Sequence, residues 1–131
     1  MIRSMPPVRL STERFAELVN EALASVPQEF RAHLDNVSVE VQDRPDRRTL
    51  SSVKLSRREL LLGVYQGVPL TRKSVSAPYD WPERILIFQR NIEACCRSER
   101  EVVEQVRRTV LHEIAHHFGM DEGDLRELGC G

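Results

Sequence analysis

The feature that most constrains the fold is a long amphipathic segment near the C-terminal end of the chain. Ser98, followed three residues later by Glu101, has the pattern of a capping box, which marks the start of a helix. A single apolar stripe, at steps of three and four residues, is formed by Val103, Val106, Val110, Ile114 and Phe118. The segment therefore predicts one long helix that packs against a core along one face.

The sequence HEIAHHFGMDE, residues 112–122, occupies the end of this predicted helix and the turn after it. His112 and His116 are four positions apart, so they lie one turn apart on the same face of a helix. Two imidazoles in this arrangement can share one tetrahedral zinc ion, at about 2.0–2.1 Å per Zn–N bond. Both histidines fall away from the centre of the apolar stripe, so the pattern predicts that they open onto a cleft.

A third zinc ligand is expected just beyond Gly119, where the glycine can turn the chain back. Glu122 occupies the position at which metzincins place their third ligand, and Asp121 is the alternative if the turn is one residue shorter. His117 is about 100° around the helix from His116, so it should point away from the metal. Two histidines and one carboxylate would leave an open position for water, which is typical of a catalytic rather than a structural zinc site.

This arrangement predicts a zinc-dependent peptidase. Zinc lowers the pKa of its bound water toward about 7, and Glu113 is placed to take the proton while the water attacks a polarised carbonyl. Glu113 then returns the proton to the leaving amine. The substrate is expected to be a peptide or protein that binds in extended form against an edge strand such as Ile85–Phe88. Tyr65, Tyr79 and His117 are candidates for stabilising the oxyanion by residue type alone.

Two alternatives share the same residues. A non-catalytic module could bind zinc or a peptide on the same scaffold, although such a module has no use for the carboxylate of Glu113. A metal-dependent hydrolase could instead act on non-peptide amides or on RNA. The formal net charge of -1, from 19 basic and 20 acidic side chains, counts against RNA and against an anionic membrane as partners.

The rest of the chain predicts a leading helix, three strands and polar connections. Ser11 or Thr12 can cap the leading helix, which should end before Pro27. Val37, Val39 and Val41 alternate with polar residues, as in a half-buried strand. The further expected segments are an irregular lead-in at 1–10, a short turn at Phe30–Leu34, a polar loop at 43–58 with the composition of a flexible segment, strands at Leu60–Tyr65 and Ile85–Phe88, a break from Arg90 to Arg97, and a last short helix at Asp124–Leu128.

Length and composition indicate one ordinary globular domain spanning residues 1–131. The three cysteines, Cys95, Cys96 and Cys130, form a poor disulfide framework and indicate reduced thiols. No apolar run approaches the about 20 residues of a membrane span, and the N-terminus lacks the apolar region of a signal peptide. We therefore expect a cytoplasmic monomer.

At these residues the chain resembles the minimal zincin-like metallopeptidase family, small bacterial proteins with the motif HExxHxxGxx(D/E). The likeness extends to Glu59–Ser74, Pro82–Glu93 and Leu125–Gly129. The resemblance implies an α+β fold with a leading helix, a small mixed sheet of three to four strands, the long HExxH helix and a short C-terminal helix.

The resemblance also implies the composition of the site. The family's zinc ligands correspond to His112, His116 and Glu122, and its catalytic acid and base corresponds to Glu113. Family members often carry aspartate where this chain has Glu122.

Overall fold

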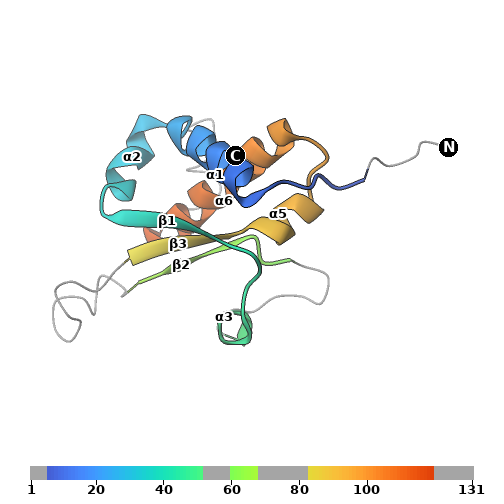
Figure 1. Ribbon diagram of the computed structural model, residues 1–131. Coiled ribbons are helices and arrows are strands. Elements are labelled where there is room, and N and C mark those ends of the chain that lie inside the picture. Colours follow the sequence, from blue (N-terminus) through green and yellow to red (C-terminus); the bar gives the residue numbers. More distant parts are fainter. Residues whose placement is uncertain (1–5, 52–59, 68–82, 120–131) are drawn as a thin grey trace.

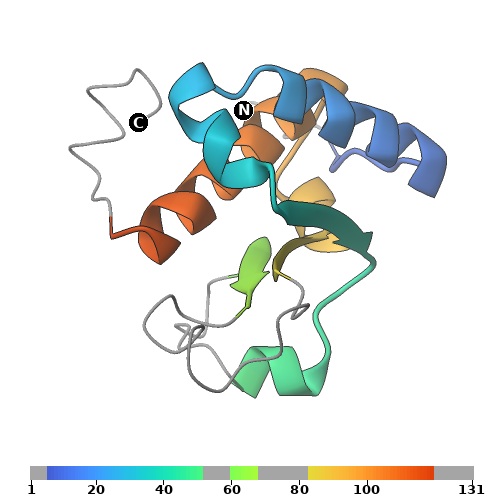
Figure 2. The same cartoon turned by 90° about the vertical axis from the view of Figure 1, so that its left-hand side faces the viewer.

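The computed structural model of the chain describes residues 6–51, 60–67 and 83–119. These residues form an α+β fold in which a three-stranded mixed sheet is covered by helices (Figure 1). Figure 2 shows α1, α2 and α6 on one side of the sheet and the short α3 on the other. The elements in chain order are α1 (Thr12–Ala24), α2 (Gln28–Leu34), β1 (Val37–Gln42), α3 (Arg47–Ser51), β2 (Gly63–Gln66), β3 (Glu83–Phe88), α5 (Gln89–Ala94) and α6 (Glu99–His117).

The α+β fold predicted from the sequence, with a leading helix, a small mixed sheet and a long helix that carries the HExxH motif, is confirmed. The expected last helix at Asp124–Leu128 lies outside the described residues. Within the described ranges, no helix is long and apolar enough to cross a membrane.

Both long helices begin at the caps that the sequence indicates. The Ser11 Oγ accepts a hydrogen bond from the Arg14 N–H at 3.0 Å at the start of α1. The Ser98 Oγ accepts from the Glu101 N–H at 3.1 Å at the start of α6. In a standard capping box the Glu101 carboxylate would accept from the N–H of the N-cap residue, Ser98. Here it accepts instead from the N–H of the preceding residue, Arg97, at 2.8 Å. Each cap satisfies backbone donors that a helix leaves unpaired.

The sheet has the strand order β1–β3–β2, with β1 parallel and β2 antiparallel to β3. The prediction that Ile85–Phe88 forms an edge strand is therefore wrong, since β3 is the central strand. The physical reason is that its apolar side chains point alternately to both faces, and Ile85, Leu86, Ile87 and Phe88 are all buried. Within the described sheet, β1 and β2 are the edges.

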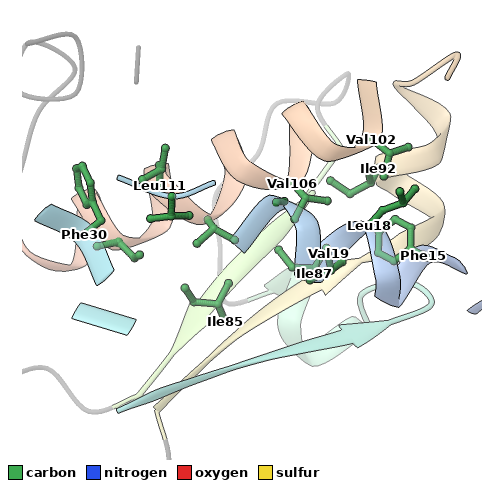
Figure 3. Packing of buried hydrophobic residues seen from close by; sticks show 14 of the residues in the cluster. Phe15, Leu18, Val19, Phe30, Ile85, Ile87, Ile92, Val102, Val106 and Leu111 are labelled. Carbon is green, nitrogen blue, oxygen red and sulfur yellow. The ribbon is translucent and has the colours of Figure 1, made fainter. Parts of the chain in front are cut away.

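The core lies between the sheet and the layer of α1, α2 and α6 (Figure 3). The predicted stripe of α6 is confirmed at Val106, Val110 and Ile114, which are fully buried, while Val103 and Phe118 are partly buried against the core. Figure 3 shows Val102, Val106 and Leu111 of α6 above Ile85 and Ile87 of β3, beside Phe15, Leu18 and Val19 of α1 and Phe30 of α2.

Helices occur at three places where the sequence predicts none. The expected break at Arg90–Arg97 contains most of α5, and the expected polar loop at 43–58 contains α3, which begins where the Asp46 Oδ1 accepts from the Thr49 N–H at 2.7 Å. The expected turn at Phe30–Leu34 is part of the regular helix α2. These helices are short, so a period of 3.6 residues hardly shows in their sequences.

Candidate functional site

The last two turns of α6 bring His112, Glu113 and His116 to one cleft. The imidazole centroids of His112 and His116 are 6.4 Å apart, close to the spacing of side chains one turn apart, so the two rings leave the helix side by side. The cleft has a volume of about 380 Å³ and is lined by Leu60, Leu61, Leu62, Gly63, Gln105, Arg108, Thr109, His112, Glu113 and His116. The three motif residues therefore line the same cleft.

The carboxyl group of Glu113 is held from the sheet side of the cleft. Its Oε1 accepts a hydrogen bond from the Tyr65 backbone N–H of β2 at 2.9 Å. Burial raises the pKa of Glu113 above its ordinary value, while the Tyr65 N–H and the nearby His116 and His112 oppose the rise. A carboxyl group that is fixed in position and has a raised proton affinity is suited to accept and return a proton.

The close approach of α6 to β2 depends on Gly63. A Cβ atom at this position would lie 2.7 Å from the Thr109 Cγ2 and 2.9 Å from the Leu86 carbonyl oxygen, which is too close for any side chain. The sequence placed Gly63 only within the predicted strand at Leu60–Tyr65, and it indicated Tyr65 only as an oxyanion candidate by residue type. The contact of the Tyr65 backbone with Glu113 was not predicted. A backbone N–H is present in nearly every residue type, so the sequence contains no signal for this contact.

His117 does not line the cleft. Its ring stacks on the ring of Tyr65, with centroids 3.9 Å apart and planes 12° apart. The Tyr65 hydroxyl donates to the Glu83 Oε2 at 3.2 Å, and burial, together with Glu83, raises the pKa of Tyr65 to about 12. The phenol is thus tied to β3 rather than offered to an oxyanion, and Tyr79, the other tyrosine candidate, lies outside the described residues.

The third ligand cannot be placed in the same way, because Glu122 and Asp121 both lie outside the described residues. In the part of the chain that is described, no group of three or more histidine, cysteine or acidic side chains is arranged to hold a metal. The helix ends at His117 with Phe118 as its C-cap, and Gly119 follows with a φ of 74°, in the left-handed region that favours glycine. His112 and His116 fit zinc as nitrogen ligands, and Glu122 remains the predicted third ligand.

Comparison with known proteins gives the family. The sequence model of the zincin-like metallopeptidases matches residues 34–131, which is more than half of the chain and includes the sheet, α6 and the HExxH motif. The chain belongs to the zincin-like metallopeptidase family. This zincin-like chain shows no match among curated proteins.

A solved structure supports the fold of the zincin-like chain. It is a conserved hypothetical protein from T. thermophilus, with 21% sequence identity and a TM-score of 0.52. The similarity covers 83% of this chain and 94% of that chain. At this level of identity the match concerns the fold alone.

Proposed function

We propose that this protein is a zinc-dependent metallopeptidase. His112, His116 and Glu122 bind the metal, and Glu113 acts as general base and then as general acid. The observation that carries the proposal is the meeting of two side-by-side imidazoles and a partly buried carboxyl group in one cleft. Membership of the zincin-like metallopeptidase family supports the same reaction class.

The residues of the site have separate roles in the proposed reaction. Zinc held by His112, His116 and Glu122 would supply an acidified water and polarise the scissile carbonyl. Glu113 takes the proton from that water and passes it to the leaving amine. The Tyr65 N–H binds only the Oε1 of Glu113, so this contact leaves Oε2 for the transfer while it fixes the orientation of the carboxyl group.

The proposed substrate is a peptide or protein in extended form. Of the two edge strands in the described sheet, β2 is the one that contacts the cleft, because Gly63 lines it and Tyr65 binds Glu113. An extended peptide can lie along such an edge and pass the two histidines. The strand β2 therefore takes the role that the sequence assigned to Ile85–Phe88.

One observation favours a non-catalytic module as the second candidate. The hydrogen bond between Glu113 and Tyr65 also joins α6 to β2, so the carboxyl group of Glu113 has a structural use that needs no catalysis. In that case the cleft would bind zinc and a peptide without cleaving it.

Zinc content and peptide cleavage, measured on the same variants, separate the two candidates. We expect about one zinc per chain in the wild type, a similar content in Glu113→Gln and weaker binding in Glu122→Ala, with Asp121→Ala as the matched comparison. Glu113→Gln keeps an oxygen for the Tyr65 N–H but removes the base, so cleavage of a peptide library, followed by mass spectrometry, should be lost. A wild type that takes up no zinc from buffered solution contradicts the metal site. Cleavage that survives Glu113→Gln contradicts the proposed base.

A further inference from the structure

The cleft beside the histidines has two chemically different walls. One wall is apolar and consists of Leu60, Leu61 and Leu62, which lead into β2. Leu60 is 50% exposed, so much of its apolar side chain is accessible to a ligand in the cleft. The other wall is the face of α6 that precedes His112, and it presents Gln105, Arg108 and Thr109.

Arg108 carries the positive charge of the second wall. It is exposed, and it forms no ion pair with any residue that the structure describes. The neighbouring Arg107 differs, because its Nη2 lies 3.8 Å from the Glu104 carboxylate. An arginine that lines a cleft and has no internal carboxylate partner can bind a carboxylate from a ligand, with two parallel N–H donors.

The position of Arg108 relative to the histidines limits where such a carboxylate would sit. Arg108 precedes His112 by one helical turn, about 6 Å along the helix axis. An extended peptide advances about 3.3 Å per residue. A peptide carboxylate that binds Arg108 therefore belongs to a residue within about two positions of the scissile bond, which would lie beside the histidines.

We propose that the cleft selects peptides in which an apolar side chain contacts Leu60–Leu62 and a carboxylate within two positions of the scissile bond binds Arg108. This inference rests on the proposed function, since it names the substrate class of the same site. The carboxylate has two possible sources, namely an aspartate or glutamate side chain and the C-terminus of the peptide. Arg108 is then a specificity-determining residue, and it takes no part in the proton transfer by Glu113.

Peptide binding to a zinc-loaded Glu113→Gln variant tests the proposal without relying on turnover. The probes are labelled, amidated peptides that contain one leucine. In each peptide a single glutamate, or a glutamine in the matched control, stands one or two positions before or after the leucine. A glutamine peptide with a free C-terminus tests the second source of the carboxylate. We expect fluorescence anisotropy to show about tenfold tighter binding of the best carboxylate-bearing peptide, the factor that corresponds to about 1.4 kcal/mol.

Further substitutions in the Glu113→Gln variant show which residue causes the preference for carboxylate-bearing peptides. Arg108→Gln should remove the preference, and Arg108→Lys should keep only part of it, because lysine retains the charge but lacks the two parallel N–H donors. Arg107→Gln is the matched control on the same helix and should leave the preference unchanged. For the apolar wall, Leu60→Ser should weaken binding of the leucine peptides, while Leu50→Ser should not, since Leu50 is also exposed but does not line the cleft.

The possible outcomes separate this inference from the proposed function. Equal binding of glutamate, glutamine and free-acid peptides overturns the inference, and so does a preference that survives Arg108→Gln. Cleavage by the wild type with no preference for a carboxylate also overturns it, while the metallopeptidase proposal stands. Carboxylate-selective binding that depends on Arg108, in a wild type that cleaves nothing, supports the inference and overturns the proposed catalysis.

Discussion

At the scale of single residues, Glu113 links the fold to the proposed chemistry. Its carboxyl group is partly buried and binds the Tyr65 N–H, and burial raises its pKa. A carboxyl group whose pKa is higher in the folded state binds its proton more tightly when the chain is folded. The stability that this group contributes is therefore present below the unfolded pKa, about 4.3, and is lost as pH rises through the folded pKa.

Glu113→Gln should remove this loss in the metal-free protein. Relative to the wild type, the variant should gain stability as pH rises through the window between the ordinary carboxyl pKa and the raised value. The slope of the difference should stay below about 1.4 kcal/mol per pH unit, the limit for one proton. Urea unfolding in the presence of a chelator, at a series of pH values, measures the difference. Parallel stability curves for the two proteins would show that the pKa of Glu113 is not raised.

At the scale of elements, the contact between α6 and β2 sets the position of the cleft. Gly63→Ala should destabilise the protein by about 1–3 kcal/mol, because the new Cβ would lie 2.9 Å from the Leu86 carbonyl oxygen, a backbone atom that cannot rotate away. Displacement of β2 by the new Cβ should also disturb the Tyr65 contact with Glu113 and lower the proposed peptidase activity. Urea unfolding and peptide cleavage report the two effects.

Gly67→Ala is the control for this change. The nearest atom to its new Cβ would be the Glu83 Cγ at 2.9 Å, part of a side chain that can rearrange. Gly67→Ala should therefore lower the free energy of unfolding less than Gly63→Ala does. Equal losses in the two variants would contradict the role given to the close approach of α6 to β2.

The segment before α1 is held to α5 by a buried carboxylate. The Glu93 Oε2 accepts from the Leu10 N–H at 3.0 Å, and its Oε1 binds the Arg90 Nη1 at 2.7 Å. Glu93→Gln should cost about 1–3 kcal/mol, because it removes a buried acceptor and leaves Arg90 with only the exposed Asp43 as a charged partner. Urea unfolding measures this loss, and hydrogen exchange should become faster at the Leu10 amide.

An exposed ion pair provides the comparison for Glu93. The Arg14 Nη2 lies 2.7 Å from the Glu99 Oε1, and both side chains are more than 40% exposed. Glu99→Gln should therefore lower the stability much less than Glu93→Gln does. Equal losses for the two variants would contradict the role given to burial.

The same elements show what a sequence can and cannot predict. The helix α6 and the strand β1 were predicted because their own residues carry the period, as Val106, Val110 and Ile114 do. The helix α5 was missed because its buried side chains include Gln89 and Glu93, whose partners are far away in the chain. The histidine pair follows from helical spacing, whereas the Tyr65 N–H reaches Glu113 only through the folding of β2 against α6.

At the scale of the whole molecule, the hydrophobic core and the candidate zinc site occupy different parts of α6. The core uses the buried stripe that faces α1 and β3, while His112 is partly exposed and His116 is exposed at the cleft. A catalytic zinc ion added to a complete core differs from a structural zinc ion, whose removal unfolds small domains. The metal-free protein should therefore stay folded.

Thermal unfolding with and without zinc tests this separation. The chelated protein should unfold in one cooperative transition, and zinc at about 100 times its Kd should add about 2.7 kcal/mol of stability and raise the Tm. His116→Ala should abolish the increase with little change in the Tm of the chelated protein, since His116 is exposed and its ring is outside the core. His33→Ala is the matched histidine control, because His33 packs on Phe118 with ring centroids 4.2 Å apart and should leave the zinc response intact. A chelated wild type that is unfolded would identify the zinc ion as structural, and a catalytic role would then lose its physical basis.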